Sequence, residues 1–229
     1  MKKLVIAHRG GASSMARENT LEAFQKAINL HADMIEFDVR RTKDQHYIIY
    51  HDPHIADKPL NEITCCEVRE IARSMGFHVP ELEEVLQVTR DRIGLDIELK
   101  EEGYEREVLD RICDVLPEAD YIVSSFHAGS ISRVKQNRSD VRTGFIFQHA
   151  AALTTDILEG DTDWLFPVQS LASSELLERM KRSGKKIAVW TVNDTQQMKR
   201  LLDDNRVEGI ITDRADAALA IRAGCKAPD

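Results

Sequence analysis

The chain has 229 residues, and its 31 lysines and arginines against 39 aspartates and glutamates give a formal net charge of −8. This length is ample for a packed core and is typical of an α/β barrel formed by one domain, so no disulfide staple is needed. The acidic balance argues against a nucleic-acid partner and against stable membrane association, since both require clustered Lys and Arg. A local basic pocket for a small anion is still compatible with this balance.

The four cysteines, Cys65, Cys66, Cys113 and Cys225, show no C-x-x-C spacing. Their pattern fits neither a disulfide framework nor a zinc site, and it indicates a reducing compartment. The apolar run Leu4–Ala7 is too short for a signal peptide, and no run approaches the length of a membrane span. We therefore expect a cytoplasmic protein.

The first elements form a βαβ unit. Leu4–Ala7 is a continuous apolar run, typical of a strand covered on both faces, and it ends at His8-Arg9-Gly10-Gly11. Asn19 precedes apolar residues at helical spacing and is the expected N-cap, with Glu22 completing a capping box. This helix leads into the second strand, Met34–Val39.

The second strand alternates apolar and acidic residues, a pattern that points Glu36 and Asp38 the same way. A short polar turn and the β-rich run Tyr47–Tyr50 follow, so an antiparallel hairpin is expected. A turn centred near Asp44-Gln45 would place His51 opposite Asp38. The hairpin would then return an imidazole to the carboxylates.

Beyond the hairpin, Leu60–Met75 is expected to form one helix and Pro80–Val88 another. Ile93–Lys100 alternates again and places Glu98 and Lys100 at the carboxyl end of a strand. The further strands expected are Tyr121–Phe126, Arg142–Phe147, Asp163–Val168, Lys186–Val192 and Gly209–Thr212. The helices expected among them are Ala128–Gln136, Ala150–Leu158, Ser173–Ser183, 194–202 and Ala215–Ala223.

Without the second arm of the hairpin, the chain has eight expected strands, most of them followed by a helix. This repetition predicts one TIM-type (β/α)8 barrel domain over residues 1–229, with a β-hairpin arm and a helical insertion at about residues 53–79. No G-x-G-x-x-G or P-loop motif supports a nucleotide-binding sheet instead.

The carboxyl ends of the strands of such a barrel converge on one mouth, where the active site lies. The residues expected there include the three strand carboxylates Glu36, Asp38 and Glu98, two imidazoles and two fixed cations. They are His8, Arg9, Glu36, Asp38, His51, Asp52, Glu98, Lys100, Ser125, Phe126, Trp190, Thr212 and Asp213.

Three carboxylates without thiolates favour a hard divalent cation, Mg²⁺ or Ca²⁺, with Mn²⁺ as a further candidate. Such a cation beside Arg9 and Lys100 would form a strong anion site, and phosphate is the commonest such ligand. Two histidines can divide the roles of general acid and general base near neutral pH. The inventory therefore predicts P–O cleavage of a metal-held phosphodiester. A salt-bridged cluster is the alternative, but it would leave excess negative charge.

Ten short motifs are spread over nearly the whole chain. They are His8-Arg9-Gly10, Glu18-Asn19-Thr20, Glu36-Phe-Asp38-Val, Thr42-Lys-Asp, His51-Asp52, Glu81-Leu-Glu-Glu-Val-Leu86, Ile97-Glu98-Leu-Lys100, Ser124-Ser-Phe126, Val189-Trp-Thr-Val-Asn193 and Gly209-Ile-Ile-Thr-Asp213. In these motifs and in their order, the chain resembles the glycerophosphodiester phosphodiesterase family. The resemblance implies a TIM barrel that hydrolyses glycerophosphodiesters to sn-glycerol 3-phosphate and an alcohol, within lipid and glycerol metabolism.

The resemblance also implies a role for each of nine matched positions. His8 and His51 look like the acid/base pair, Glu36, Asp38 and Glu98 like the metal ligands, Arg9 and Lys100 like phosphate contacts, and Phe126 and Trp190 like walls around the glycerol or the alcohol. The partner implied is a small-molecule phosphodiester.

Two departures from the family pattern bear on the mouth. Arg17 stands where the family usually has proline, a change expected to affect only the loop. The segment between His51-Asp52 and Pro80 is shorter than usual and lacks the Arg-Thr-Thr-Gly-like stretch that often follows His-Asp. The insertion is therefore expected to be reduced and the mouth more open.

Several polar and charged residues are expected to have structural roles instead. Asn19 is expected to act as a cap, and Asp96 to pair with an interior donor. The run Glu101-Glu102 with Glu105-Arg106-Glu107 is expected to be a solvated face. Asp52 is either a ligand neighbour or a turn former. His54 and His127 are expected to be the likeliest of the remaining histidines to line the mouth.

Two rival functions are compatible with the sequence. A phosphodiesterase of the lysophospholipase D type would need a long apolar groove near the mouth. A non-catalytic phosphate-ester binding protein would be expected to lack an imidazole or a ligand carboxylate, and this chain keeps them all. The sequence leaves open the alcohol, the metal, the choice between monomer and homo-oligomer, which histidine is the base, and whether water or a substrate hydroxyl attacks phosphorus.

Overall fold

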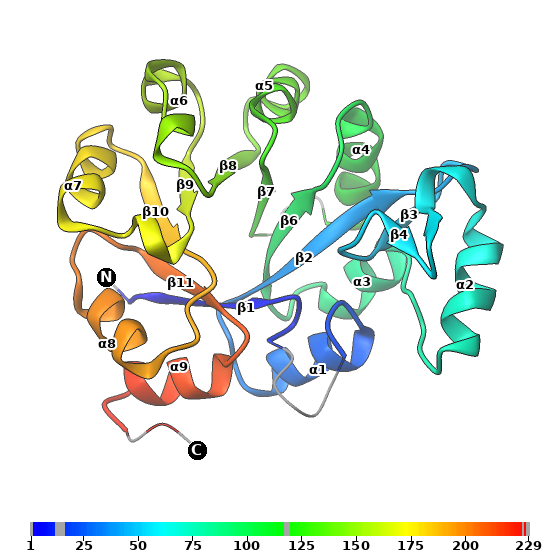
Figure 1. Ribbon diagram of the computed structural model, residues 1–229, viewed down its shortest axis with the longest axis horizontal. Coiled ribbons are helices and arrows are strands. Elements are labelled where there is room, and N and C mark those ends of the chain that lie inside the picture. Colours follow the sequence, from blue (N-terminus) through cyan, green and yellow to red (C-terminus); the bar gives the residue numbers. More distant parts are fainter. Residues whose placement is uncertain (1, 12–16, 117–119, 226, 228–229) are drawn as a thin grey trace.

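The structure, a computed structural model, describes residues 2–11, 17–116, 120–225 and 227 (Figure 1). Eight strands in these ranges pair in parallel, and the first pairs with both the second and the last, which closes a barrel. They are β1 Leu4–His8, β2 Met34–Arg41, β6 Gly94–Leu99, β7 Tyr121–Ser125, β8 Arg142–Phe147, β9 Trp164–Pro167, β10 Lys186–Val189 and β11 Gly209–Thr212. The predicted TIM-type barrel is confirmed.

Helices lie around the outside of the barrel (Figure 1). They are α1 Leu21–Asn29, α3 Leu82–Thr89, α4 Glu105–Val115, α5 Ala128–Asn137, α6 Thr155–Glu159, α7 Ser174–Arg182, α8 Thr195–Asp203 and α9 Ala215–Arg222, with short 3₁₀ helices η2 Ala150–Ala152 and η3 Gln169–Leu171. The sequence analysis assigned no helix where α4 forms.

Apolar side chains fill two layers, because neighbouring residues of a strand point to opposite faces. The larger layer lies between the strands and the helices. A smaller cluster, which includes Ile6, Met34 and Ile211, fills the barrel interior. Met34, Glu36 and Asp38 share one face of β2, so both carboxylates point into the barrel.

The predicted starts of two helices are wrong, and the caps explain why. Thr20 caps α1, since its hydroxyl oxygen accepts a hydrogen bond from the backbone of Ala23, and Asn19 is left for another role. The single helix expected over Leu60–Met75 is divided into η1 Leu60–Glu62 and α2 Cys65–Ser74. Thr64 and Glu67 form a capping box that starts α2 afresh.

The hairpin forms as predicted, with β3 Tyr47–Ile49 antiparallel to β2, but its register is one residue away from the expected one. Val39 pairs with Ile49, and the backbone N–H of Tyr50 donates to the backbone carbonyl of Asp38, so His51 does not face Asp38. The turn centres on Asp44, whose carboxylate accepts hydrogen bonds from the Thr42 hydroxyl and the Cys65 backbone. A contact with α2 therefore fixes the turn.

The insertion lies beside the hairpin, at the edge of the barrel (Figure 1). It contains the short antiparallel pair β4 His54–Ile55 and β5 Lys58–Pro59, then η1 and α2. Its apolar side chains form a small core of their own with Ile48 of β3. None of the helices described is long and apolar enough to reach across a lipid bilayer.

Asp33 ties the two ends of the barrel sequence together. Its carboxylate accepts a hydrogen bond of 2.8 Å from the backbone of Val5 and pairs with Lys2 and with Arg222 of α9. Burial acts to raise the pKa of Asp33, but these partners outweigh it and hold the pKa below its usual value. The ionised Asp33 therefore stabilises the folded state fully above the unfolded-state pKa of about 3.9. This stabilisation is lost as the pH falls through the lower folded-state pKa.

We expect Asp33→Asn to lower the free energy of unfolding by about 1–2 kcal/mol at pH 7, because the amide keeps an acceptor but loses the charge. The figure is modest because Lys2 is exposed and contributes little. Urea unfolding at several pH values should show that the difference in unfolding free energy between the wild type and the variant shrinks toward pH 3. The exposed Asp203→Asn is the control, and a difference independent of pH would contradict the ionic role of Asp33.

Candidate active site

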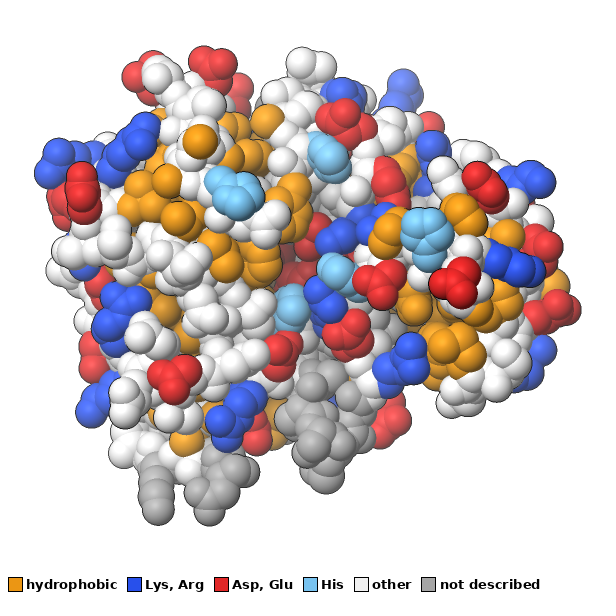
Figure 2. Space-filling model, viewed as in Figure 1, with side chains coloured by type: hydrophobic (Ala, Val, Ile, Leu, Met, Phe, Trp, Pro, Cys, Tyr) orange, Lys and Arg blue, Asp and Glu red, His pale blue; other side chains and the backbone are white. Residues whose placement is uncertain are grey.

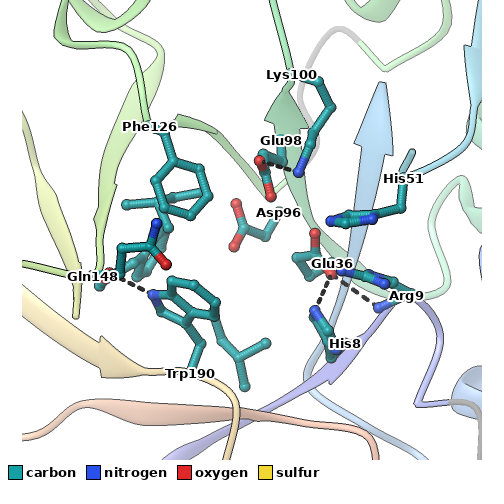
Figure 3. Close-up of a pocket in the computed structure, with 13 residues that line it drawn as sticks. His8, Arg9, Glu36, His51, Asp96, Glu98, Lys100, Phe126, Gln148 and Trp190 are labelled. Atoms are coloured by element: carbon teal, nitrogen blue, oxygen red, sulfur yellow. Dashed lines mark hydrogen bonds and ion pairs between the residues drawn. The ribbon is translucent and has the colours of Figure 1, made fainter. Parts of the chain in front are cut away.

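A cavity of about 330 Å³ opens at the carboxyl ends of the barrel strands. Figure 2 shows this hollow, with acidic side chains deep inside it and histidine and basic side chains at its rim. Charged groups line one side and apolar groups the other (Figure 3). The lining residues are His8, Arg9, Glu36, His51, Asp96, Glu98, Lys100, Phe126, Ile146, Gln148, Phe166, Trp190 and Ile211.

Three buried carboxylates meet at one side of this cavity, with Glu36 and Glu98 in its lining and Asp38 fully buried beside them. Glu36 and Asp38 come from β2, and Glu98 is the register partner of Asp38 on β6. One oxygen from each lies within 4.8 Å of the others. Burial, together with the neighbouring carboxylates, raises the pKa of Glu36 well above its usual value and that of Glu98 to about 7. A bound cation would relieve this repulsion.

Asp38 is the ionised member of the three. It receives a 2.7 Å hydrogen bond from the Asn19 amide, and it lies 3.2 Å from Arg9 Nε and 3.2 Å from Lys100 Nζ. Burial acts to raise the pKa of Asp38, but Lys100 and Arg9 outweigh it and bring the pKa below its usual value. One charged carboxylate thus anchors both cations beside the cavity.

Asn19 is a site residue that the sequence analysis assigned to capping. It is buried, with a φ of 56° that asparagine tolerates better than most residues, and its side chain points at Asp38 instead of capping α1. Only the Glu-Asn-Thr motif could have signalled this role.

The loop after β1 is shaped by Arg9 and Gly10. Arg9 has a φ of 50°, which directs its backbone N–H to Glu36 Oε2 at 2.9 Å, while its guanidinium contacts Glu18 at 3.0 Å. Gly10 has a φ of 91°, and a Cβ there would lie 2.6 Å from the Cβ of Ala23 on α1. Glycine is therefore required for α1 to pack against this loop.

His8 is held by a chain of hydrogen bonds from residues that follow β11 and β10. Its Nδ1 lies 2.6 Å from Asp213, whose other oxygen accepts a 2.6 Å hydrogen bond from the Asn193 amide. An ionised carboxylate can only accept a hydrogen bond, so His8 carries its proton on Nδ1. Its other ring nitrogen, Nε2, faces the cavity and lies 3.9 Å from Glu36. The sequence analysis included Asp213 and Asn193 in motifs but assigned them no role.

His51 enters the cavity from the far end of the hairpin (Figure 3). Its Nδ1 lies 2.8 Å from the Asp52 carboxylate, and its backbone carbonyl accepts a 2.7 Å hydrogen bond from Arg40. Burial, with help from Lys100 and Arg9, lowers the pKa of His51 despite the opposing effect of Asp38. Asp52 is thus a hydrogen-bond partner of His51.

Lys100 lies between the carboxylates and the apolar side of the cavity. Its Nζ is 2.7 Å from Glu98 and 5.8 Å from the ring centre of Phe126. Phe126 meets Trp190 edge to face at 5.5 Å, and the Trp190 indole donates a 2.7 Å hydrogen bond to the Phe166 carbonyl. These two rings form a wall opposite the carboxylates (Figure 3).

Asp96 and Gln148 also line the cavity. Asp96 has the predicted interior donor, since Ser124 donates to it at 2.6 Å, and burial raises its pKa to about 7. Gln148 was not predicted and reaches the cavity beside Trp190 (Figure 3). His54 and His127 are absent from the described lining.

The sequence profile of the glycerophosphoryl diester phosphodiesterase family matches residues 8–217. A glycerophosphodiester phosphodiesterase from Caldanaerobacter subterraneus subsp. tengcongensis is 32% identical over 233 residues, which cover 93% of this chain and 95% of that protein.

Two solved structures share the fold at 23% sequence identity. A glycerophosphodiester phosphodiesterase from Parabacteroides distasonis has a TM-score of 0.86, with coverage of 97% of this chain and 98% of that one. A phosphodiesterase from Oleispira antarctica, solved in complex with the product sn-glycerol-3-phosphate, has a TM-score of 0.81, with coverage of 94% and 96%. The chain therefore belongs to the glycerophosphoryl diester phosphodiesterase family and is a phosphoric diester hydrolase.

Proposed function

We propose that this enzyme performs metal-dependent hydrolysis of glycerophosphodiesters to sn-glycerol 3-phosphate and an alcohol, with His8 and His51 as the acid/base pair. The observation that carries the proposal is the convergence of both imidazoles, a carboxylate trio and two cations on one cavity. The Caldanaerobacter relative's name and the product bound to the Oleispira protein support the same substrate class.

The carboxylate trio of Glu36, Asp38 and Glu98 fits a hard divalent cation. Its donors are all oxygens, and burial together with the neighbouring carboxylates raises the pKa of Glu36 and Glu98, an unfavourable environment for negative charge that a bound cation would relieve. Mg²⁺ or Ca²⁺ matches this donor set best, with Mn²⁺ as a further candidate. Such an ion, when bound, supplies charge stabilisation to the phosphoryl oxygens.

The fixed cations and the histidines supply the rest of the chemistry. Arg9 and Lys100, both protonated beside Asp38, would hold the phosphate through charge-assisted hydrogen bonds. One imidazole would take the proton of the attacking hydroxyl, which belongs to water or to the substrate glycerol, and the other would protonate the leaving alkoxide. Detection of a cyclic phosphate would identify the substrate glycerol as the source of the attacking hydroxyl.

The apolar wall of Phe126 and Trp190 would pack against the glycerol or the alcohol. We place alcohol selectivity at the neighbouring insertion, residues 53–79, whose reduced length would leave the mouth open to several headgroups. The four free cysteines support a reducing, cytoplasmic location.

The proposal is tested by release of sn-glycerol 3-phosphate from glycerophosphocholine, glycerophosphoethanolamine and glycerophosphoglycerol. We expect chelated enzyme to be inactive and one or more of Mg²⁺, Ca²⁺ and Mn²⁺ to restore turnover. Turnover that survives exhaustive chelation would contradict metal dependence. Turnover of lysophosphatidylcholine alone would replace the proposed substrate with a lysophospholipid.

A further inference from the structure

A second group of metal-binding side chains lies outside the cavity, where the hairpin meets the insertion. His46 comes from the hairpin turn, Cys65 is the first residue of α2, and Glu81 directly precedes α3. One donor atom from each lies within 4.8 Å of the others, and His46 Nδ1 is 2.7 Å from Glu81 Oε2. Nitrogen, sulfur and oxygen donors from three elements thus face one point.

The exposure of these side chains suits a site that fills from solvent. Cys65 is buried, with 4% of its surface exposed, and the Glu81 side chain is 20% exposed. The His46 side chain is 49% exposed and forms the open side of the group. The group is therefore open to solvent on the side of His46.

Asp44 and Arg69 lie around the three donors, with Asp44 beyond hydrogen-bond distance of His46. The second ring nitrogen of His46 lies 3.9 Å from the Asp44 carboxylate, and Asp44 also accepts the backbone N–H of Cys65 at 2.9 Å. Arg69 pairs with Glu81 Oε1 at 2.6 Å and leaves Oε2 for the cluster. Carboxylates behind a ligating imidazole are usual around protein-bound metals.

The geometry points to a transition-metal site of the zinc type, and we propose that His46, Cys65 and Glu81 bind Zn²⁺ with water as the fourth ligand. Thiolate and imidazole exclude Mg²⁺ and Ca²⁺ as natural occupants, and this three-donor set suits tetrahedral Zn²⁺. Binding breaks the S–H bond of Cys65, releases that proton to solvent and forms a sulfur–metal bond. The His46 proton that Nδ1 donates to Glu81 moves through solvent to Nε2, so that Nδ1 can ligate the ion and the imidazole stays neutral. The sequence analysis predicted no zinc site because its ligands follow no cysteine motif, His46 and Glu81 being 35 positions apart.

The ion would fasten the insertion to the hairpin. The insertion packs only a small core of its own, around Ile48, Ile55 and Val68. Small units of this kind are often stabilised by a metal. The same hairpin carries His51 into the cavity, so the site would stabilise the segment that positions an imidazole.

Cobalt substitution tests the proposal without using enzymatic activity. Reduced, metal-stripped protein would be titrated with Co²⁺, which gives a near-ultraviolet charge-transfer band when bound to thiolate. The carboxylate cavity cannot produce this band, because no cysteine is among its described lining residues. We expect the band to reach the intensity of one thiolate-bound ion per chain and to disappear when Zn²⁺ displaces Co²⁺.

The neighbouring cysteine provides a matched control. Cys66 is exposed at the next position of α2, so Cys66→Ser should keep the band and Cys65→Ser should lose it. His46→Ala, at a half-exposed position, should fold and bind Co²⁺ at least about tenfold more weakly, since even outer partners of a metal contribute about 10–100-fold. The absence of a band in the wild type, an unchanged band in Cys65→Ser, or unchanged affinity in His46→Ala would overturn the site and leave a hydrogen-bonded cluster.

Discussion

Replacing either His8 or His51 with alanine should lower kcat/KM for glycerophosphodiesters by about a hundredfold or more, the scale of one general acid or base. Each imidazole lines the cavity and is oriented by its own carboxylate, at 2.6 Å for His8 and 2.8 Å for His51. Neither side chain belongs to the apolar layers, so both variants should fold. The exposed His127→Ala is the matched control and should retain full activity.

A substrate with an activated leaving group separates the two roles. A glycerophosphodiester of p-nitrophenol needs no proton on its leaving oxygen, so the variant that lacks the general acid should recover most of its rate on this ester. The variant that lacks the base should stay slow on both substrates. Retention of more than about a tenth of wild-type kcat/KM by either alanine variant would contradict the acid/base assignment.

The barrel could be predicted because its signal is local. Strand β11 forms over the predicted residues Gly209–Thr212, and the alternation of β2 placed Glu36 and Asp38 on one face. The register of the hairpin could not be predicted in the same way. It depends on the hydrogen bond from the Cys65 backbone to Asp44, a contact between residues 21 positions apart.

The burial of a charged residue can also depend on contacts with another helix, which the local sequence does not reveal. Glu105 was expected on a solvated face, and that prediction is wrong, because only 3% of its surface is exposed. Its carboxylate accepts hydrogen bonds from Ser130 and Arg133 on α5 and from the backbone of Gly103. Nothing in a run of acidic residues distinguishes the one that will meet donors from a neighbouring helix.

Arg17 also makes a contact that could not be predicted from the sequence. This departure from the family pattern was expected to change only the loop. Its guanidinium instead lies 3.5 Å from the ring centre of Phe77, which stacks on Tyr50 beside His51. The residue therefore connects the loop before α1 with the end of the insertion, a contact that requires the fold.

The second large effect is expected at Asp213, a positioning residue for His8. Burial acts to raise the pKa of Asp213, but hydrogen bonds from His8 and Asn193 outweigh it and hold the pKa below its usual value. The carboxylate is therefore ionised and fixes the His8 proton on Nδ1. We expect Asp213→Asn to lower kcat/KM by about 10²–10⁴, the range of a lost acid/base group.

The reason lies in Asn193. Its amide oxygen accepts hydrogen bonds from the Thr212 hydroxyl at 3.1 Å and from the Asp213 backbone at 3.0 Å, so its NH₂ group must face Asp213. In Asp213→Asn the new amide would turn its oxygen toward that NH₂ group and its own NH₂ toward His8. His8 would then carry its proton on Nε2, the nitrogen that faces the cavity, and could not accept a proton there.

Exchanging the two residues tests this orientation. In the double variant Asp213→Asn/Asn193→Asp, the carboxylate at 193 would accept the new amide's NH₂, and the amide oxygen would again face His8 Nδ1. We expect the double variant to regain part of the lost rate, with the rest missing because no charge faces the imidazole. The His8 tautomer, read from ¹⁵N chemical shifts, should be inverted in the single variant and restored in the double one. A single variant with wild-type tautomer and rate would show that Asp213 does not position His8.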